Sequence, residues 1–362
     1  MDALEKNYLL KMKDMPVLRF NIAKMMCEVY NESYIPYQLR NAIEYDTACS
    51  AKNYNAFLSY LSSRTLPMSR ENAKKIHNAL GMSQAQDPQT RARFSLAYNS
   101  ISLQDNFWVH EEKERKSWSD VDIRQNKLSR VLSDVALHGY SVSIQGTIHT
   151  PEVATNGAYA KGWRREDGKL YLFKKGYNNG KESQIEVSVS NILDKCNVKH
   201  VKYHKVMEDK TYYCKCECMT NQKLNILPAC DFISYCTRLG LDWKKEVMRI
   251  DSESMYKMFI VDYLISNTDR HNLNWGFFFD CDTMQILGCH PLFDHNNSFS
   301  EDAIKNDSLR SLVIEGVTMR SLALRSLERV DFHFTSKIKR SDFVSGEHYK
   351  SFKRRSEYLG LW

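Results

Sequence analysis

A change in the pattern of apolar residues near residue 140 constrains the fold of this 362-residue chain more than any other feature. Before it, apolar residues recur at three- and four-residue spacing, which predicts helices. After it, short alternating or β-rich runs predict strands until about residue 222, where the helical pattern returns. This order predicts an α+β, bilobal protein with a small β-rich lobe, a larger helical lobe and a ligand cleft between them.

The first 125 residues are predicted to form a mainly helical N-terminal domain, in which no catalytic constellation is found. The helical spacing occurs at Leu18, Ile22, Met25 and Met26, at Ala56, Phe57, Tyr60 and Leu61, and over 70–80, where Gly81 ends the pattern. Residues 126–220 are predicted to be the β-rich lobe and 221–362 the helical lobe. Strands are expected at 141–144, 170–173, 198–206, 211–219 and around 277 and 286, and an amphipathic helix at 183–195.

Composition sets broad limits on function. The chain is 43% hydrophobic and 26% charged, so it is not compositionally disordered. A net charge of +7 suits the binding of anions such as nucleotides, but a solvated basic surface accounts for it as well, and it is too small to indicate nucleic acid. The charged start Met1–Lys6 lacks the apolar segment of a signal peptide. No stretch approaches the ~18 apolar residues of a membrane span.

Ten cysteines in such a chain indicate free thiols in a reducing cytoplasm. Three of them, Cys214, Cys216 and Cys218, alternate with other residues. Alternation places side chains on one face of a strand, whereas zinc ligands are usually two or more residues apart in turns. The pattern favours a buried strand face over a metal or disulfide site.

The residues that carry chemistry follow a predicted buried helix, for which Asp251 or Ser252 is a suitable cap. The helix ends at Asn267, and the polar run Asp269, Arg270, His271 and Asn274 comes directly after it, in a loop. A loop at the end of a core helix is held rigidly and exposed at one edge, which is where scaffolds place reactive groups.

Asp269 and Asn274 are five residues apart, so both can face one cleft. A carboxylate there can accept a proton from an incoming hydroxyl, and an amide oxygen can ligate Mg²⁺. A predicted hairpin with its turn at 280–283 then returns the chain to Asp294, which we expect beside Asn274 as the main metal ligand. An ordinary polar turn is the alternative for an isolated Asp–Asn pair.

The β-rich lobe supplies a candidate cation. Lys174, at the end of a predicted strand, can reach nucleotide phosphates, and Glu186 in the next helix can hold it; Lys175 is the competing choice. The candidate phosphate-covering loop is 155–162, with Asn156, Gly157, Ala158 and Lys161 as its binding residues. It has only two glycines, so by itself it is also consistent with an ordinary hairpin loop.

These residues resemble a known family, the HipA-like bacterial serine/threonine kinases, including the CtkA type. The resemblance runs from about 140 to 300. It rests on Asn267–His271 with Asn274 and Gly276, on Pro291–Asp294, and upstream on Asn156-Gly157, Lys161, Trp163, Tyr171–Lys174, Glu186-Val187 and His200–Tyr203. It implies a protein-kinase-like fold and transfer of phosphate from ATP, with Mg²⁺, to a protein hydroxyl.

The resemblance also implies individual roles. Asp269 becomes the catalytic base, Asn274 and Asp294 hold Mg²⁺, Lys174 binds the α/β-phosphates and Glu186 positions it. His271 organises the loop, and adenine lies against the strand that ends near Cys218. Autophosphorylation in the phosphate loop, at Thr155 or behind it at Thr150 or Thr147, ejects that loop and disables the enzyme. A toxin-type regulator with a helix-turn-helix antitoxin as partner is implied too, with DNA contacted through the partner and not directly.

Some features depart from a protein-kinase pattern. Asp294 is followed by His295-Asn296 and not by Phe-Gly, and no Ala-Pro-Glu motif follows. The Asp-Arg-His order is shared with phosphoinositide kinases, so a lipid or small-molecule kinase is the first alternative. The basic C-terminal segment 337–355 can contact an anionic membrane, or be a solvated helix face. A regulatory or binding module with a degenerate site is the second alternative, although all five key polar positions are filled.

Overall fold

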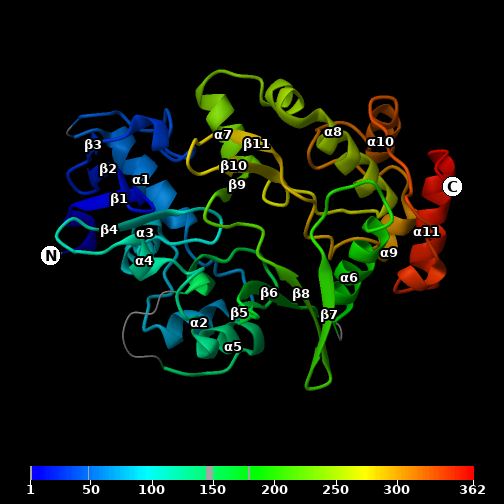
Figure 1. Cartoon of the computed structure of the whole chain (residues 1–362), viewed down its shortest axis with the longest axis horizontal. Coiled ribbons are helices and arrows are strands. Elements are labelled where there is room, and N and C mark those ends of the chain that lie inside the picture. The colour runs from blue at the N-terminus through cyan, green and yellow to red at the C-terminus, as the bar shows by residue number, and fades with distance from the viewer. Residues whose placement is uncertain (1, 48, 144–149, 178–179) are drawn as a thin grey trace.

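The computed structural model describes residues 2–47, 49–143, 150–177 and 180–362. Within these ranges the chain forms three antiparallel sheets and a set of helices, and Figure 1 shows them in one connected body with the N-terminal sheet and the C-terminal helices at opposite sides. The α+β architecture expected from the sequence is confirmed. None of the helices in the described ranges is both long and apolar enough to cross a membrane.

The N-terminal region combines its helices with a four-stranded sheet, which opens the region and has the order β3-β2-β1-β4. The strands are β1 (Tyr8–Met12), β2 (Met15–Asn21), β3 (Met26–Val29) and β4 (Phe107–Glu111). The helix expected around Leu18 and Ile22 is therefore wrong. Met25 has φ +54°, a left-handed conformation that ends any helix, and it turns the chain between β2 and β3.

Helices of this region pack beside that sheet and against the next one. They are α1 (Ala51–Ser63), α2 (Ala73–Ala79), α3 (Pro88–Ala97), α4 (Trp118–Val121) and α5 (Arg130–His138), with the 3₁₀ turns η1 (Ala3–Glu5), η2 (Glu32–Tyr34) and η3 (Pro151–Ala154). The predictions around Phe57 and over 70–80 are confirmed as α1 and a shorter α2. The strand expected at 141–144 is wrong over 141–143, which has no regular structure, and residue 144 lies outside the described residues.

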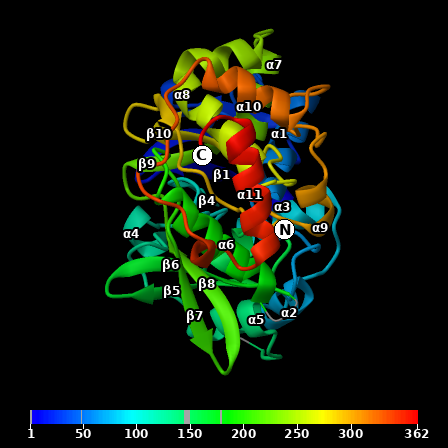
Figure 2. The same cartoon turned by 90° about the vertical axis from the view of Figure 1, so that its right-hand side faces the viewer.

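The small lobe is a four-stranded sheet in the order β5-β6-β8-β7, with α6 against it (Figure 2). Its elements are β5 (Lys161–Glu166), β6 (Lys169–Lys175), α6 (Lys181–Leu193), β7 (Tyr203–Glu208) and β8 (Thr211–Glu217). Strand β7 begins later than expected. Cys214 and Cys216 are buried on one face of β8, as the alternation predicted, whereas Cys218 lies beyond the strand and is partly buried. All ten cysteines are free thiols.

The third sheet, β11-β10-β9, begins the helical lobe. Its strands are β9 (Leu224–Pro228), β10 (Gly276–Asp280) and β11 (Ile286–Cys289), and β9 is a strand that the sequence pattern did not reveal. The helices are α7 (Ala229–Arg238), α8 (Trp243–Leu264), α9 (Glu301–Lys305), α10 (Met319–Leu327) and α11 (Gly346–Tyr358), with the turn η5 (Arg340–Asp342). Helix α8 is interrupted at Asp251, whose carboxylate accepts the amide of Ser254 at 3.0 Å and so caps its second half as expected.

Candidate active site

Lys174 is the centre of a buried cluster between the lobes. It stands near the end of β6, and its Nζ lies 2.7 Å from Asp294 Oδ1 and 3.3 Å from Glu186 Oε2. The same Nζ donates to the hydroxyl of Tyr203 at 3.1 Å. Because side chains alternate along a strand, Lys175 lies on the opposite face of β6. The two residues that the sequence pairs, Lys174 and Glu186, therefore lie together, and Asp294 joins them.

Charge holds this cluster in one arrangement. Burial alone would lower the pKa of Lys174, but the carboxylates of Asp294 and Glu186 hold that pKa well above its usual value. Burial would likewise raise the pKa of Asp294, yet the ammonium groups of Lys174 and Lys161 outweigh it and keep that pKa well below the usual range. Burial raises the pKa of Glu186 against the effect of Lys174. The ionised pair of Lys174 and Asp294 is thus strongly favoured.

Asp269 presents a partly open carboxylate after the end of α8. Its side chain is 34% exposed, and its Oδ2 accepts the amide of Asn297 at 2.7 Å. Asn274 donates its side-chain nitrogen to the backbone carbonyl of Asp269 at 2.8 Å, which closes the loop and turns the amide oxygen away from that carbonyl. His271 accepts the amide of Leu273 at 3.2 Å and is exposed, so its observed contact organises the loop.

Arg270 joins the loop that carries Asp269 to the loop that carries Asp294. Its guanidinium forms a two-pronged pair with Asp262 of α8, with distances of 3.1 Å and 3.0 Å. Its Nη1 donates to the carbonyls of Asn274 at 2.7 Å and Phe293 at 2.8 Å. A planar, buried guanidinium fixes all these partners at once. The backbones of Asn274 and of the residue before Asp294 are therefore held by a single nitrogen.

The candidate phosphate loop leads into β5, whose first residue, Lys161, pairs in register with Lys174 of β6. Gly157 has φ +103°, and a Cβ built on it would overlap the ammonium of Lys161, so any other residue there would strain the backbone and move that flexible side chain. Lys161 is buried, and burial lowers its pKa to about 8. Asn156 and Ala158 lie in the same loop, in irregular backbone between η3 and β5. Thr147 lies outside the described residues.

Cys218 lies just beyond β8, at the start of the linker between the lobes. Its amide donates to the carbonyl of Leu170 at 2.8 Å, and its side chain is partly buried beside Trp163 and Leu170. Cys218 therefore lies where the small-lobe sheet ends and the linker begins. Its own amide is already used by β6 and is not free for a ligand.

Sequence reasoning did not single out several residues of this site. Asp262 carries a charge inside the apolar stretch 258–265, and a carboxylate in such a stretch signals a buried partner, which is Arg270. Asn297 follows Asp294 by three residues and bonds to Asp269, but nothing in its spacing marks it. Tyr159, whose hydroxyl lies 3.2 Å from Asn297 Oδ1, links the phosphate loop to the same group.

The donors at this site fit Mg²⁺. Among the described residues, no three His, Cys, Asp or Glu side chains gather closely enough to hold a metal ion by themselves. Asp294 and Asn274 offer one carboxylate and one amide oxygen, from loops joined by Arg270. Mg²⁺ is commonly bound by one or two carboxylates, completed by phosphate oxygens and water. Asp294 also has φ +58°, an uncommon backbone conformation that is often found at functional positions.

Fold and site together define a bilobal, kinase-like protein. No family model and no curated protein matches the sequence. Among solved structures, the chain is similar to HipA of the Shewanella oneidensis MR-1 toxin–antitoxin system, described in complex with HipB and its operator DNA. The two are 13% identical, and the match covers 98% of each chain with a TM-score of 0.51. The Helicobacter pylori proinflammatory kinase CtkA is also similar, with 14% identity, 57% of this chain and 91% of that chain covered, and a TM-score of 0.41. The likeness to HipA establishes a HipA-like kinase fold.

Proposed function

We propose that this chain is an ATP- and Mg²⁺-dependent serine/threonine protein kinase of the HipA-like type. The observation that carries the proposal is the hydrogen-bonded cluster of Lys174, Glu186 and Asp294, set beside a loop whose Asp269 is partly open to solvent. Phosphoryl transfer requires positioning and neutralisation of charge more than covalent help. This cluster supplies a fixed cation and a fixed anion, and Asp269 supplies an acceptor for a proton.

In this proposal each side chain has a separate task. Lys174 binds the α- and β-phosphates, and Glu186, which is fully buried, holds its ammonium in place. Asp269 accepts the proton of the attacking hydroxyl, and its hydrogen bond from Asn297 fixes the direction of its carboxylate. Asp294 and Asn274 hold Mg²⁺, which neutralises phosphate charge when it is bound. Gly157 and Lys161 cover the phosphates from above.

Phosphate transfer from radiolabelled ATP tests the proposal directly. The wild type, Asp269→Asn and the control Asp331→Asn are incubated with Mg²⁺ and a basic protein substrate. Asp331 is 81% exposed, so its variant keeps the fold. We expect Asp269→Asn to lose at least ~10²-fold in labelling rate, since a proton acceptor in the transition state is removed. Equal labelling by Asp269→Asn and the wild type would refute the assignment.

We further propose that the enzyme phosphorylates itself at Thr155. This hydroxyl donates to the carbonyl of Pro151 at 2.6 Å and accepts from the indole of Trp163 at 2.9 Å. A phosphate there cannot make both bonds, so modification would release the loop. Thr150 is a less accessible candidate, because it is buried. Phosphopeptide mapping of self-labelled, inactivated protein should place the label at 155; label confined to residues outside 147–159 would argue against this site.

The similarity to the Shewanella HipA is also the basis for proposing a partner protein. The Shewanella HipA is described in complex with HipB and operator DNA. We propose that this chain also acts as a toxin-type regulator with a helix-turn-helix antitoxin, through which any contact with DNA is made. Co-purification of this chain with the product of a neighbouring gene, followed by size-exclusion chromatography, tests the pairing; a chain that remains alone when both proteins are co-expressed contradicts it.

A further inference from the structure

The linker between the lobes, residues 218–223, is hydrogen-bonded to the N-terminal region. The guanidinium of Arg124 donates to Thr220 Oγ1 at 2.8 Å, to Leu103 O at 3.0 Å and to Asn106 Oδ1 at 2.9 Å. Asn106 in turn donates to the carbonyls of Asn221 at 3.3 Å and Gln222 at 3.0 Å. One partly buried arginine, Arg124, and one buried asparagine, Asn106, thus tie the linker to the loop that precedes β4.

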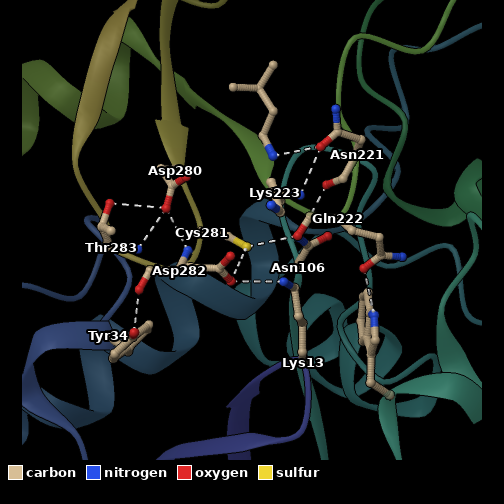
Figure 3. Close-up of polar contacts among 12 residues, drawn as sticks. Lys13, Tyr34, Asn106, Asn221, Gln222, Lys223, Asp280, Cys281, Asp282 and Thr283 are labelled. Atoms are coloured by element: carbon tan, nitrogen blue, oxygen red, sulfur yellow. Dashed lines mark hydrogen bonds and ion pairs between the residues drawn. The ribbon is translucent and has the colours of Figure 1, made fainter.

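The linker is held from its other side by the turn between β10 and β11. Cys281 donates its thiol proton to the carbonyl of Gln222 at 2.9 Å. The next residue, Asp282, pairs with Lys13 of the N-terminal sheet at 3.0 Å, and its carbonyl accepts the hydroxyl of Tyr34. Figure 3 shows Cys281 and Asp282 beside Gln222, with Asn106 and Lys13 next to them. The linker therefore lies between the N-terminal region and the helical lobe, bonded to both.

The same N-terminal region reaches the candidate phosphate loop. Arg70, just before α2, donates to the carbonyls of Glu152 at 3.2 Å and Thr155 at 3.1 Å, and also to that of Lys161. Glu71 donates its amide to the carbonyl of Ala158 at 2.7 Å, and its carboxylate accepts the amide of residue 160 at 3.3 Å. The backbone of the loop is thus held at both ends and in its middle by two consecutive residues.

Arg70 is buried and Arg124 is partly buried, and desolvation of both guanidinium groups costs free energy. Burial lowers the pKa of Arg70 to about 10 and also lowers that of Arg124. The hydrogen bonds described above run to neutral carbonyl, amide and hydroxyl oxygens and not to carboxylates. A charge buried with neutral acceptors contributes little to stability compared with apolar packing, but its rigid set of donors fixes several acceptors at once. Such groups determine position more than they determine stability.

From these contacts we infer that the N-terminal region is an internal brace of the nucleotide cleft, in which Arg124 and Arg70 are positioning residues for the linker and the phosphate loop. The brace itself is a property of the fold, whereas its effect on catalysis rests on the proposed kinase function. Both elements would contact a nucleotide in the cleft: the loop covers the phosphates, and the linker borders the base. By holding both the phosphate loop and the linker, the N-terminal region would fix the space between them in which the nucleotide binds.

Hydrogen–deuterium exchange tests the brace without requiring any activity. The full chain is compared with Arg124→Gln, with the isosteric variant Thr220→Val and with Glu71→Ala. Arg93→Ala is the matched control, since Arg93 pairs at the surface with Asp2 and contacts neither element. We expect about ten-fold faster exchange over 218–224 in the first two variants and over 157–161 in Glu71→Ala, and no change in the control. If Arg124→Gln does not fold, Thr220→Val still tests the contact with the linker, and Glu71→Ala tests the contact with the phosphate loop.

In kinetic terms, loss of these contacts should change KM for ATP but not kcat. With the brace loosened, KM for ATP should rise about ten-fold while kcat stays within about two-fold, because binding geometry is lost and the catalytic groups are untouched. Unchanged exchange in all three variants would overturn the brace even for an active kinase. Faster exchange in the variants, together with a wild type that does not turn over ATP, would retain the brace and reject the proposed function.

Discussion

At the residue scale, Lys161 is the group in the site whose charge is most open to change. Burial lowers its pKa to about 8, and Lys174 and Arg70 add to this lowering. The carboxylates of Asp294 and Glu186 act in the opposite direction and only partly offset it. Lys161 is therefore protonated below about pH 8 and becomes neutral above it.

This ionisation predicts a pH dependence of nucleotide affinity. A triphosphate binds the protonated ammonium, so affinity should fall as pH rises through about 8, by about ten-fold between pH 7.5 and 9. In Lys161→Arg the guanidinium stays charged over this range, and the dependence should vanish. Equilibrium binding of a fluorescent ATP analogue at several pH values measures both curves. The same slope in the two proteins would exclude Lys161 as its cause.

Single residues show what the sequence can and cannot reveal about the site. Lys174 and Glu186 were recognisable because the strand and the helix that carry them have clear periodicity, and Asp294 because a short hairpin leads to it. Arg270 was noticed only as part of a polar run. Its role depends on Asp262, Asn274 and Phe293 meeting around it, and such meetings are decided by tertiary packing and not by local pattern.

At the element scale, the loop before β5 depends on a glycine. A Cβ at Gly157 would overlap the ammonium of Lys161, whereas at Gly168, in the turn between β5 and β6, nothing lies within 4 Å. Both glycines have positive φ, so both replacements by alanine strain the backbone. Comparing Gly157→Ala with Gly168→Ala therefore distinguishes the effect of backbone strain from the effect of displacing Lys161.

We expect Gly157→Ala and Gly168→Ala each to lose about 1 kcal/mol of unfolding free energy, as measured by urea denaturation. Only Gly157→Ala should weaken ATP binding, by several-fold, because only there must the Lys161 ammonium move. Equal affinity in the two variants would show that the close approach of Gly157 and Lys161 has no part in binding.

Helices and strands were predictable where a single hydrophobic period, helical or alternating, dominates their sequence. Strand β8 and helix α6 were found because their patterns run over seven or more residues, and β6 was found from the shorter β-rich run 170–173. The N-terminal sheet was not found, since Leu18, Ile22 and Met25 fit helical spacing equally well, and the distinguishing fact is the backbone of Met25. Strand β9 is only five residues long and is defined by its pairing with β10, a long-range contact that no local pattern shows.

At the scale of the whole molecule, we propose a division into an N-terminal domain (1–125), a small lobe (126–220) and a helical lobe (221–362). Many contacts cross these boundaries. Helix α2 packs on α5 through Ile76 and Val135, and the hydroxyl of Tyr37 donates to the carbonyl of Met284 at 2.5 Å. The first domain is thus integrated with both lobes, which a reading of sequence segments one by one does not convey.

The central claim is that the cluster of Lys174, Glu186 and Asp294 binds a nucleoside triphosphate. Calorimetric titration of the full chain with ATP, with and without Mg²⁺, measures this directly. The account predicts binding that Mg²⁺ strengthens in the wild type, and at least ten-fold weaker binding in Lys174→Met, from which the ammonium is missing. Asp331→Asn should bind as the wild type does. Absence of binding in the wild type, or equal affinity in Lys174→Met, would contradict the claim.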